Sequence, residues 1–363
     1  MALNHLFKVY ERHLSREIYG ATALVLFAFL LLFAFFDLVH EFEDIGKGGY
    51  ELKSAIFFVL LSMPGRIYEL FPVAVLIGTL YALTALARHS EITVLRVSGL
   101  STRRFLAVLA KIGLVFVVLT FVVGEFVAPV AERAAQQLRI KAMRTVVAQE
   151  FRSGLWIKDG MSFVNVRVVQ QDARLNQVRI YEFDASNRLR SISEAEEGVY
   201  VPPDRWRLRN IVKTVFDGDS ARVERIPEAT WYSALNPDIL SVLLVVPEKM
   251  SLTNLLTYIQ HLSENHQKTD RYKIAFWKKL AYPLAAWVMM ALALPFAYMQ
   301  DRGGTVSLKV FAGVMIGITF HLLNGLFSSL GIINSWTPFL SAITPSVLFL
   351  LAASTMIWWV ERR

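Results

Sequence analysis

Six apolar segments, each long enough to cross a bilayer, constrain this chain more than any other feature of its sequence. A transmembrane helix needs about 20 mostly apolar residues, and each segment meets that length. Hydrophobic residues make up 55% of the chain and the mean hydropathy is +0.43, well above the values of a soluble domain. We therefore expect six transmembrane helices, at Ile18–Val39, Ser54–Ala87, Phe105–Val130, Leu280–Met299, Val306–Leu330 and Pro338–Val360.

The second segment, Ser54–Ala87, is longer than one membrane crossing requires. It contains Pro64, which lacks a backbone N–H and disfavours a helical conformation in the residue before it. We expect the helix to break near Met63–Arg66, so that Ile67–Ala87 crosses the membrane and Ser54–Met63 rises beyond the lipid core.

A polar block of roughly residues 131–279 separates the third and fourth apolar segments. Within it, apolar and polar residues alternate over Val164–Val168, Gln177–Phe183 and Ile211–Phe216, which predicts β-strands. Turn-forming residues recur between such runs, as in Asp217–Asp219. Strands spaced at about 8–12 residues favour a sandwich or a jelly roll.

The predicted fold is therefore an α+β membrane protein, with six transmembrane helices and a jelly-roll-like β domain inserted between helices three and four. We expect residues 1–135 to hold the first three helices, 136–266 the β domain with a helical linker at its end, and 267–363 the last three helices. Ser251 is expected to cap the linker helix, because a serine hydroxyl accepts a hydrogen bond from a free N–H of the first turn.

Basic residues in the short connections predict the orientation in the membrane. They gather in the N-terminal tail, in the connection Arg88–Arg104, after Met299 and at the C-terminus, whereas Gly331–Thr337 has none. Cytoplasmic loops carry more Lys and Arg, so both termini and Arg88–Arg104 are expected in the cytoplasm. The large polar domain is then expected on the outer side.

The connection Arg88–Arg104 is expected to contain a short helix at about residues 88–100. Ser90 suits the N-cap, and Glu91 falls in the first turn, where the helix dipole favours a negative charge. Gly99 suits a left-handed helix end, and Arg96 adds positive charge. A two-turn helix tethered to a span at each end could be pushed by a partner and move both spans; the alternative is an ordinary capped loop.

The charged residues inside the apolar segments include Arg66, Glu69 and Glu125, and a charge without a partner is costly there. Arg66 and Glu69 are three residues apart on one helix and are expected to pair. Helix length places Glu125 at the same outer level as Arg66, so the two could form a bridge. The alternative is that each charge reaches interfacial water.

The sequence offers no set of catalytic residues. It has no cysteine, no phosphate-binding loop of the G-x-x-x-x-G-K-[ST] type and no arrangement of Ser, His and Asp, so no catalytic activity and no cofactor is expected. His261, Glu264 and His266 are more typical of a solvated helix than of a metal site. In the fifth segment, His321 and Asn324 either bond neighbouring helices or face a substrate or partner.

Charged residues also gather at the expected outer ends of the first and third segments. The acidic group is read as a solvated rim, with a divalent-cation site as the alternative; it comprises Asp37, Glu41, Glu43 and Asp44. Arg133 and Arg139 are candidates for binding phosphate, because the planar guanidinium group binds two oxygens at once. The alternative is that these residues anchor a helix at the lipid headgroups.

Four motifs in this layout resemble a known family. Ser90–Val94 (SEITV), followed by Gly99, is similar to the cytoplasmic loop of the LptF/LptG permeases of lipopolysaccharide export in Gram-negative bacteria. Three further motifs resemble the LptG branch rather than the LptF branch: Ile45–Tyr50 (IGKGGY), Gly124–Pro129 (GEFVAP) and Gly154–Gly160 (GLWIKDG). The likeness extends over essentially the whole chain.

The resemblance implies a permease subunit in the inner membrane, with its β domain in the periplasm. It implies pairing with LptF, a groove in a dimer of the LptB ATPase for the short helix, and contact of Glu91 with a basic residue of LptB. Arg88, Arg96 and Gly99 would belong to the same coupling element. Lipopolysaccharide would pass to the β domains of LptC and LptA, and no nucleic acid is involved.

One departure from the family pattern concerns the lipid phosphates. The family often carries basic residues at the outer end of the first span, whereas here Lys47 is the basic residue near an acidic group. Phosphate contact is therefore expected to shift to Arg133 and Arg139, or to be bridged by cations. Two alternatives to this function stay open: an LptF-like position in the same complex, and an envelope scaffold that does not transport.

Overall fold

The computed structural model describes residues 2–47, 49–143, 154–169, 174–184, 186–202, 204–218, 220–233, 246–264, 267–298 and 306–362. Its helices are α1 Ala2–Glu41, α2 Leu52–Arg88, α3 Glu91–Val97, α4 Thr102–Val122, α5 Ala128–Met143, α7 Leu252–Glu264, α8 Asp270–Ala281, α9 Ala285–Tyr298, α10 Val306–Ile333 and α11 Pro338–Glu361. Single turns lie at η1 Phe42–Asp44, η4 Pro247–Lys249 and η5 Tyr282–Leu284, and η2 Val123–Val127 is a π-helical turn.

The prediction of six membrane spans is confirmed. Within the described residues, six helical units are long and apolar enough to cross a membrane. The third unit joins α4, η2 and α5 into Thr102–Arg139, and the fourth joins α8, η5 and α9 into Asp270–Phe296. The chain is therefore a multi-pass membrane protein.

The predicted break in the second segment is wrong. α2 is one helix of 37 residues with Pro64 and Pro72 inside it. Neighbouring helices can compensate for the backbone bonds that a proline removes in a membrane helix. Here Phe71, Pro72 and Ala74 and most residues after them are buried, so packing against other helices supports the continuous α2.

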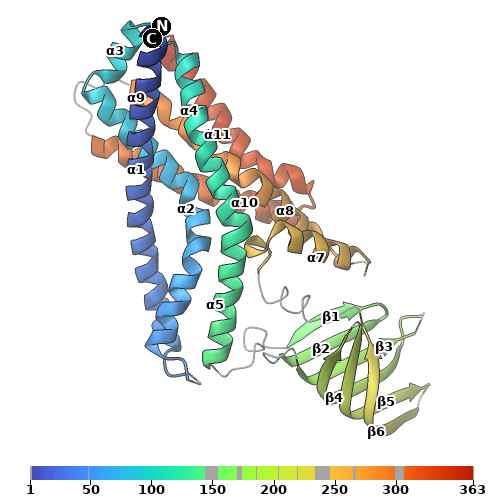
Figure 1. Ribbon diagram of the computed structural model, residues 1–363. Helices are drawn as coiled ribbons and strands as arrows, with labels where there is room; N and C mark the ends of the chain where they lie inside the picture. Colours follow the sequence, from blue (N-terminus) through green and yellow to red (C-terminus); the bar gives the residue numbers. More distant parts are fainter. Residues whose placement is uncertain are drawn as a thin grey trace.

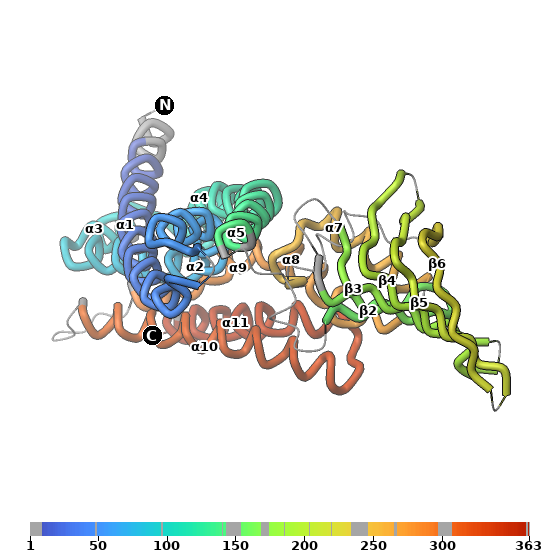
Figure 2. Tube along the Cα trace, turned by 90° about the horizontal axis from the view of Figure 1, so that it is seen from below, coloured from blue at the N-terminus to red at the C-terminus, as the bar shows by residue number. Residues whose placement is uncertain are grey.

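The two ends of the helical bundle differ in what they carry. Figure 1 shows both termini and α3 at one end, and the β-sheet beyond the opposite end, which the lower parts of α1, α2 and α5 approach. Figure 2 shows that the sheet lies to the side on which α7 and α8 are found. α3 and the β-sheet therefore lie beyond opposite ends of the helical bundle.

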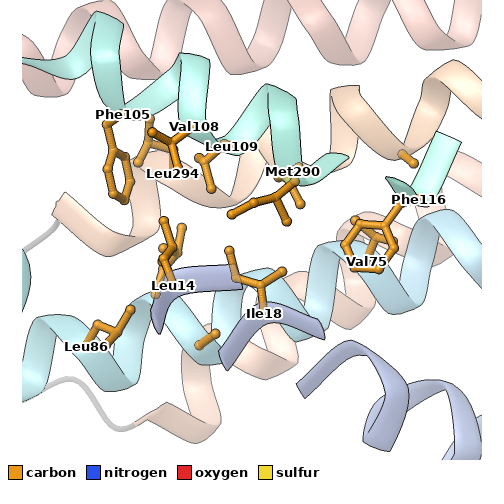
Figure 3. Packing of buried hydrophobic residues seen from close by; sticks show 14 of the residues in the cluster. Leu14, Ile18, Val75, Leu86, Phe105, Val108, Leu109, Phe116, Met290 and Leu294 are labelled. Carbon is orange, nitrogen blue, oxygen red and sulfur yellow. The ribbon is translucent and has the colours of Figure 1, made fainter. Parts of the chain in front are cut away.

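The core of the bundle joins helices from both halves of the chain. Leu14 and Ile18 of α1 are buried with Phe105 and Leu109 of α4, and with Met290 of α9. Figure 3 shows these side chains pointing toward one another between their helices. Since each buried large aliphatic or aromatic side chain contributes about 1.5–3 kcal/mol, the first and last three spans are held as one unit.

The β domain is a single antiparallel sheet with the strand order β1-β2-β3-β4-β5-β6. Its strands are β1 Leu155–Asp159, β2 Ser162–Val169, β3 Leu175–Phe183, β4 Leu189–Val201, β5 Arg205–Asp217 and β6 Ser220–Tyr232. They confirm the three predicted strand runs. β5 ends at Asp217, where the predicted turn begins, and Asp219 lies outside the described residues. The sheet follows α5 and precedes α7, so it is inserted between the third and fourth spans as predicted.

Strand spacing favoured a sandwich or a jelly roll, and the described strands form one sheet in place of the two packed sheets of a sandwich. Each strand pairs with its neighbour in sequence, which makes one up-and-down sheet. Apolar residues that alternate along β1 to β5 meet on one side of this sheet around Trp206, which is fully buried. Alternation identifies strands and their buried face, but it does not specify which strands pair.

The β3–β4 turn contains a carboxylate held by backbone groups. Asp184 accepts hydrogen bonds from the backbone N–H of Arg188 at 2.9 Å and of Ser186 at 2.8 Å. These bonds lower the pKa of the Asp184 carboxyl below its usual value, and the bond from Arg188 has the largest effect. The turn is therefore most stable when Asp184 is ionised.

Candidate functional site

The short helix α3 lies between the second and third spans, as predicted, and has seven residues. Gly99 has φ 97°, and the N–H of Leu100 donates to the carbonyl of Leu95 at 3.0 Å, which is a left-handed helix end. The beginning differs from the expectation, because Ser90 has φ 60° instead of the extended backbone of an N-cap.

The two faces of α3 have different surroundings. Ile92 is 5% exposed and Leu95 packs with it against the bundle core. Val94 and Val97 are 62% and 84% exposed, so they face away from the bundle. Ile92 and Leu95 are three residues apart and share one side of the helix, which leaves an apolar outer side available to another protein.

The polar residues of α3 lie at the same end of the bundle. His13 Nε2 of α1 lies 3.2 Å from a carboxylate oxygen of Glu91, and both side chains are about half exposed. Arg88, the last residue of α2, and Gly99 are exposed as well. The side chain of Arg96 lies outside the described part of the chain. Glu91 is therefore accessible to a partner that approaches α3.

A polar cavity of about 440 Å³ lies near the other end of the bundle. Its walls come from α1, α2, α5, α8 and α10, together with the segment around η4. Charged residues of both signs line it: Asp37, Glu41, Arg66, Glu69, Glu132, Arg139, Glu248, Lys249, Lys278 and Lys279. A cavity of this composition suits the polar part of an amphiphile better than an apolar chain.

Arg66 is held by two carboxylates on the cavity wall. Its Nη2 and Nε donate to the two carboxylate oxygens of Asp37 at 2.7 and 3.0 Å. Its Nη1 lies 3.2 Å from Glu69, which confirms the pair expected from helical spacing. The hypothesis of an Arg66–Glu125 bridge is wrong, since Glu125 contacts Lys279 at 3.8 Å and the N–H of Leu252.

Three acids of the group at the end of α1, Asp37, Glu41 and Asp44, form ion pairs, whereas Glu43 is exposed as a solvated rim would be. Glu41 is 3% exposed and accepts a hydrogen bond from the Tyr50 hydroxyl at 2.7 Å. Burial, and then the Glu41 carboxylate, raise the pKa of Tyr50, so its hydroxyl stays protonated as the donor. Arg139 lies 3.6 Å from Glu41 and closer to Asp44, which also pairs with Lys47 at 2.7 Å.

This network changes the set of candidate phosphate ligands. Arg139 and Lys47 already neutralise carboxylates, so an anion would have to compete with Asp44. Arg133 is partly exposed on α5 and has no ion pair with a described residue, but it does not line the cavity. Lys278 does line it, and its described polar contact is a long hydrogen bond of 3.5 Å to Ser328.

The remaining polar candidates are placed as follows. His321 and Asn324 of α10 both line the cavity, which favours a surface that faces a substrate or partner over bonds between neighbouring helices. Asn324 is 6% exposed. His261 and Glu264 lie on α7, and His266 falls outside the described residues. Among the described residues, no group of three or more His, Cys, Asp or Glu is arranged to hold a metal ion.

Sequence reasoning missed the residues that reach the cavity from the fourth span and its preceding segment. Lys249 lies 2.9 Å from Glu132, which is 5% exposed, and Lys279 is 7% exposed beside Glu125. A signal was present, because Lys278 and Lys279 directly precede the apolar segment at Leu280. Basic residues there also suit a headgroup anchor, so their inward direction needed the structure.

Comparisons with known proteins identify the family to which this chain belongs. The family described as "Lipopolysaccharide export system permease LptF/LptG" matches residues 12–359. The chain is 31% identical over 354 residues to the lipopolysaccharide export system permease protein LptG of Haemophilus influenzae, covering 97% of this chain and 98% of that protein. It is 30% identical over 359 residues to LptG of Escherichia coli strain K12, covering 98% and 99%. The chain therefore belongs to the LptF/LptG family of lipopolysaccharide export system permeases.

Proposed function

We propose that this chain occupies the LptG position of the exporter and that ATP hydrolysis in a separate LptB dimer drives it through α3. Membership of the family makes the chain a non-catalytic permease subunit that works in a complex with other Lpt components. The finer assignment adds pairing with LptF, delivery to LptC and LptA, and location in the inner membrane. The LptG-like motifs and the two LptG relatives support it.

The observation that carries the proposal is the outward face of α3 at the end of the bundle opposite the β-sheet. Val94, Val97 and Glu91 are exposed there, next to both termini. The basic connections favour a cytoplasmic location for that end, where ATP is available. A seven-residue helix with its inner face fixed to the core transmits a push to the two spans that it connects.

In this proposal the membrane part comprises residues 1–135 and 267–363, and 136–266 form the periplasmic domain. Lipopolysaccharide enters from the outer leaflet between this chain and LptF, and its phosphates lie against the cavity end of the bundle. Arg133 and Lys278 are the cations best placed to contact these phosphates. Arg139 and Lys47 would have to leave Asp44 before they could bind a phosphate. Closure of the cavity would then move the lipid toward the β-sheet.

The experiment that tests the coupling compares Glu91→Ala with wild type in a reconstituted complex with LptF, LptB and LptC. ATP hydrolysis and lipid release to LptA are measured on the same vesicles. We expect Glu91→Ala to lower lipid release per ATP hydrolysed while the complex still assembles. Glu43→Ala, which removes an exposed acid from the other end of the bundle, is the matched control.

Unchanged release per ATP in Glu91→Ala would contradict coupling through this residue and favour a scaffold that does not transport. The choice between the LptG and LptF positions has its own test. Co-purification in mild detergent is expected to yield one LptF and two LptB copies for each copy of this chain. Recovery of a complex whose other permease is an LptG would place this chain in the LptF position.

The lipid contact is tested separately by crosslinking lipopolysaccharide to Arg133→Glu and Lys278→Glu variants. We expect both to reduce crosslinking, because each replaces a cation by an anion near the lipid phosphates. Normal crosslinking in both variants would exclude these two residues as ligands.

A further inference from the structure

Two carboxylates of the third span fasten the segment that leads from the β domain back to the membrane. Glu132 of α5 lies 2.9 Å from Lys249 Nζ in η4. Glu125 of η2 accepts the backbone N–H of Leu252, at 3.0 Å to one oxygen and 2.9 Å to the other. Glu125 and Glu132 thus hold the same short segment at two points three residues apart.

Lys279 of α8 completes this arrangement. Its Nζ lies 3.8 Å from Glu125 and also donates to the carbonyl of Met250, so one lysine contacts both the carboxylate and the segment. The side chains of Glu125 and Lys279 are 10% and 7% exposed. Separating such charges in a buried site is unfavourable, which favours a contact that stays closed.

The motif Gly124–Pro129 gives this arrangement its geometry. Pro129 has no N–H to offer to the carbonyl of Glu125 four residues earlier, and the helix accommodates this with the π-turn η2. A side chain at Gly124 would come within 2.4 Å of the Tyr68 ring, so glycine lets α2 approach. The widened turn directs Glu125 toward the returning segment. The proposed coupling through α3 does not explain this direction of the side chain.

Apolar packing supports the returning segment from its other side. Met250 and Leu255 are almost fully buried against Ala275 of α8. The rings of Tyr258 in α7 and Tyr272 in α8 lie 4.6 Å apart. The segment, α7 and α8 therefore form one packed body, and the two carboxylates attach that body to the third span.

We propose that Glu125 and Glu132 are positioning residues that form a permanent joint between the third span and the returning segment 247–252. The β domain is connected to the membrane helices through α5 and through η4. Both connections are then attached to the third span, because α5 belongs to it and η4 is bound to it. The joint lies on the cavity wall, because Glu132, Lys249 and Lys279 all line the cavity. Closure of the cavity moves α5, η4 and α7 together, and the joint does not open. The claim that these elements move together during transport rests on the proposed function, whereas the joint itself does not.

The distance across the joint tests the proposal without any lipid. The chain has no cysteine, so Gln137→Cys on α5 and Thr257→Cys on α7 allow two spin labels at exposed positions. Electron paramagnetic resonance distances are measured in the complex without nucleotide and in its ATP-trapped state. We expect one narrow distribution at the same distance in both states.

Charge exchange then shows whether the ion pair causes the rigidity. Lys249→Glu is expected to broaden the distribution, and Lys249→Glu with Glu132→Lys to restore it, because the pair is re-formed with exchanged charges. Lys249 is 44% exposed, so this change is compatible with a folded chain. Lys268→Ala, an exposed lysine between α7 and α8, is the matched control.

A bridge across the joint tests its role in transport. Cysteines in place of Glu132 and Lys249 are linked by a short bifunctional thiol reagent in the reconstituted complex. We expect the linked and wild-type complexes to release lipid at the same rate. A shift in distance between nucleotide states, an unchanged distribution in Lys249→Glu, or a block of release in the linked complex would each overturn the proposal. If neither wild type nor any variant released lipid, that result would contradict the proposed function and not the joint.

Discussion

The contact between Glu125 and Lys279 yields a prediction whose magnitude follows from burial. Lys279, whose side chain is 7% exposed, keeps only the Met250 carbonyl as a described partner of its ammonium group when Glu125 is replaced by Leu. Leaving one member of a buried ion pair unpaired costs about 3–5 kcal/mol. The same change removes the acceptor of the Leu252 N–H, which contributes about 1–3 kcal/mol of that loss.

A second substitution separates these contributions. Lys279→Met in the Glu125→Leu background removes the unpaired charge and keeps a side chain of similar length. The double variant is then expected to lose the part from Leu252, about 1–3 kcal/mol, and about 1 kcal/mol for the bond from Lys279 to the Met250 carbonyl. Glu125→Gln, which keeps an acceptor for the Leu252 N–H, should lie between wild type and Glu125→Leu.

The free energy of unfolding is measured by titration with sodium dodecyl sulfate. Wild type, Glu125→Leu, Lys279→Met and the double variant form a double-mutant cycle. We expect the double variant to be more stable than Glu125→Leu alone. If the two substitutions are instead additive and the double variant is the least stable, the charges of Glu125 and Lys279 do not depend on each other, and the reasoning is refuted.

Three further predictions concern α3 and the β domain. Gly99→Val should destabilise the end of α3, because φ 97° strains a β-branched residue, and lower ATP-coupled lipid release by the reconstituted complex. Trp206→Ala should destabilise the β domain by about 3–5 kcal/mol, measured by proteolysis of the full chain, because this side chain is fully buried in the sheet core. Asp184→Asn should speed hydrogen exchange in the β3–β4 turn at neutral pH. Because the native pKa of Asp184 is lowered, its contribution is present above the unfolded pKa and is lost as the pH falls through the native value, where the variant and wild type should converge.

The parts of the fold that depend on local sequence were predictable. Segment length and apolarity identified the six spans, and period-two alternation identified β2, β3 and β5. Glycine at position 99 marked the end of α3, because a left-handed residue is needed there. The Ser251 cap is also confirmed, since its hydroxyl accepts the N–H of Asn254 at 3.2 Å.

The parts that depend on contacts between distant segments were not predictable. The spacing of Arg66 and Glu69 fixes their pairing on one helix, but Asp37 is on another helix, and the rotation of α1 decides whether it faces Arg66. For the same reason, the charges at the end of α1 suggested a solvated rim until Arg139 and Tyr50 were seen to cover Glu41. Helix packing, which determines these contacts, leaves little trace in residue spacing.

The continuity of α2 illustrates a different limit. Rules for proline are derived mainly from helices in water, where an interrupted backbone bond has few substitutes. In α2 the residues after Pro64 are packed against α1 and α9, and that tertiary support outweighs the local preference.

The central claim is that a separate ATPase acts on this chain through α3. A photoactivatable residue at position 97 in the assembled complex tests it most directly, because Val97 is 84% exposed on the outer face of α3. A residue at position 223 on β6, where Val223 is 60% exposed, is the control. The account predicts a crosslink to LptB from position 97 and none from position 223. No crosslink from position 97, or a crosslink to LptB from position 223, would contradict it.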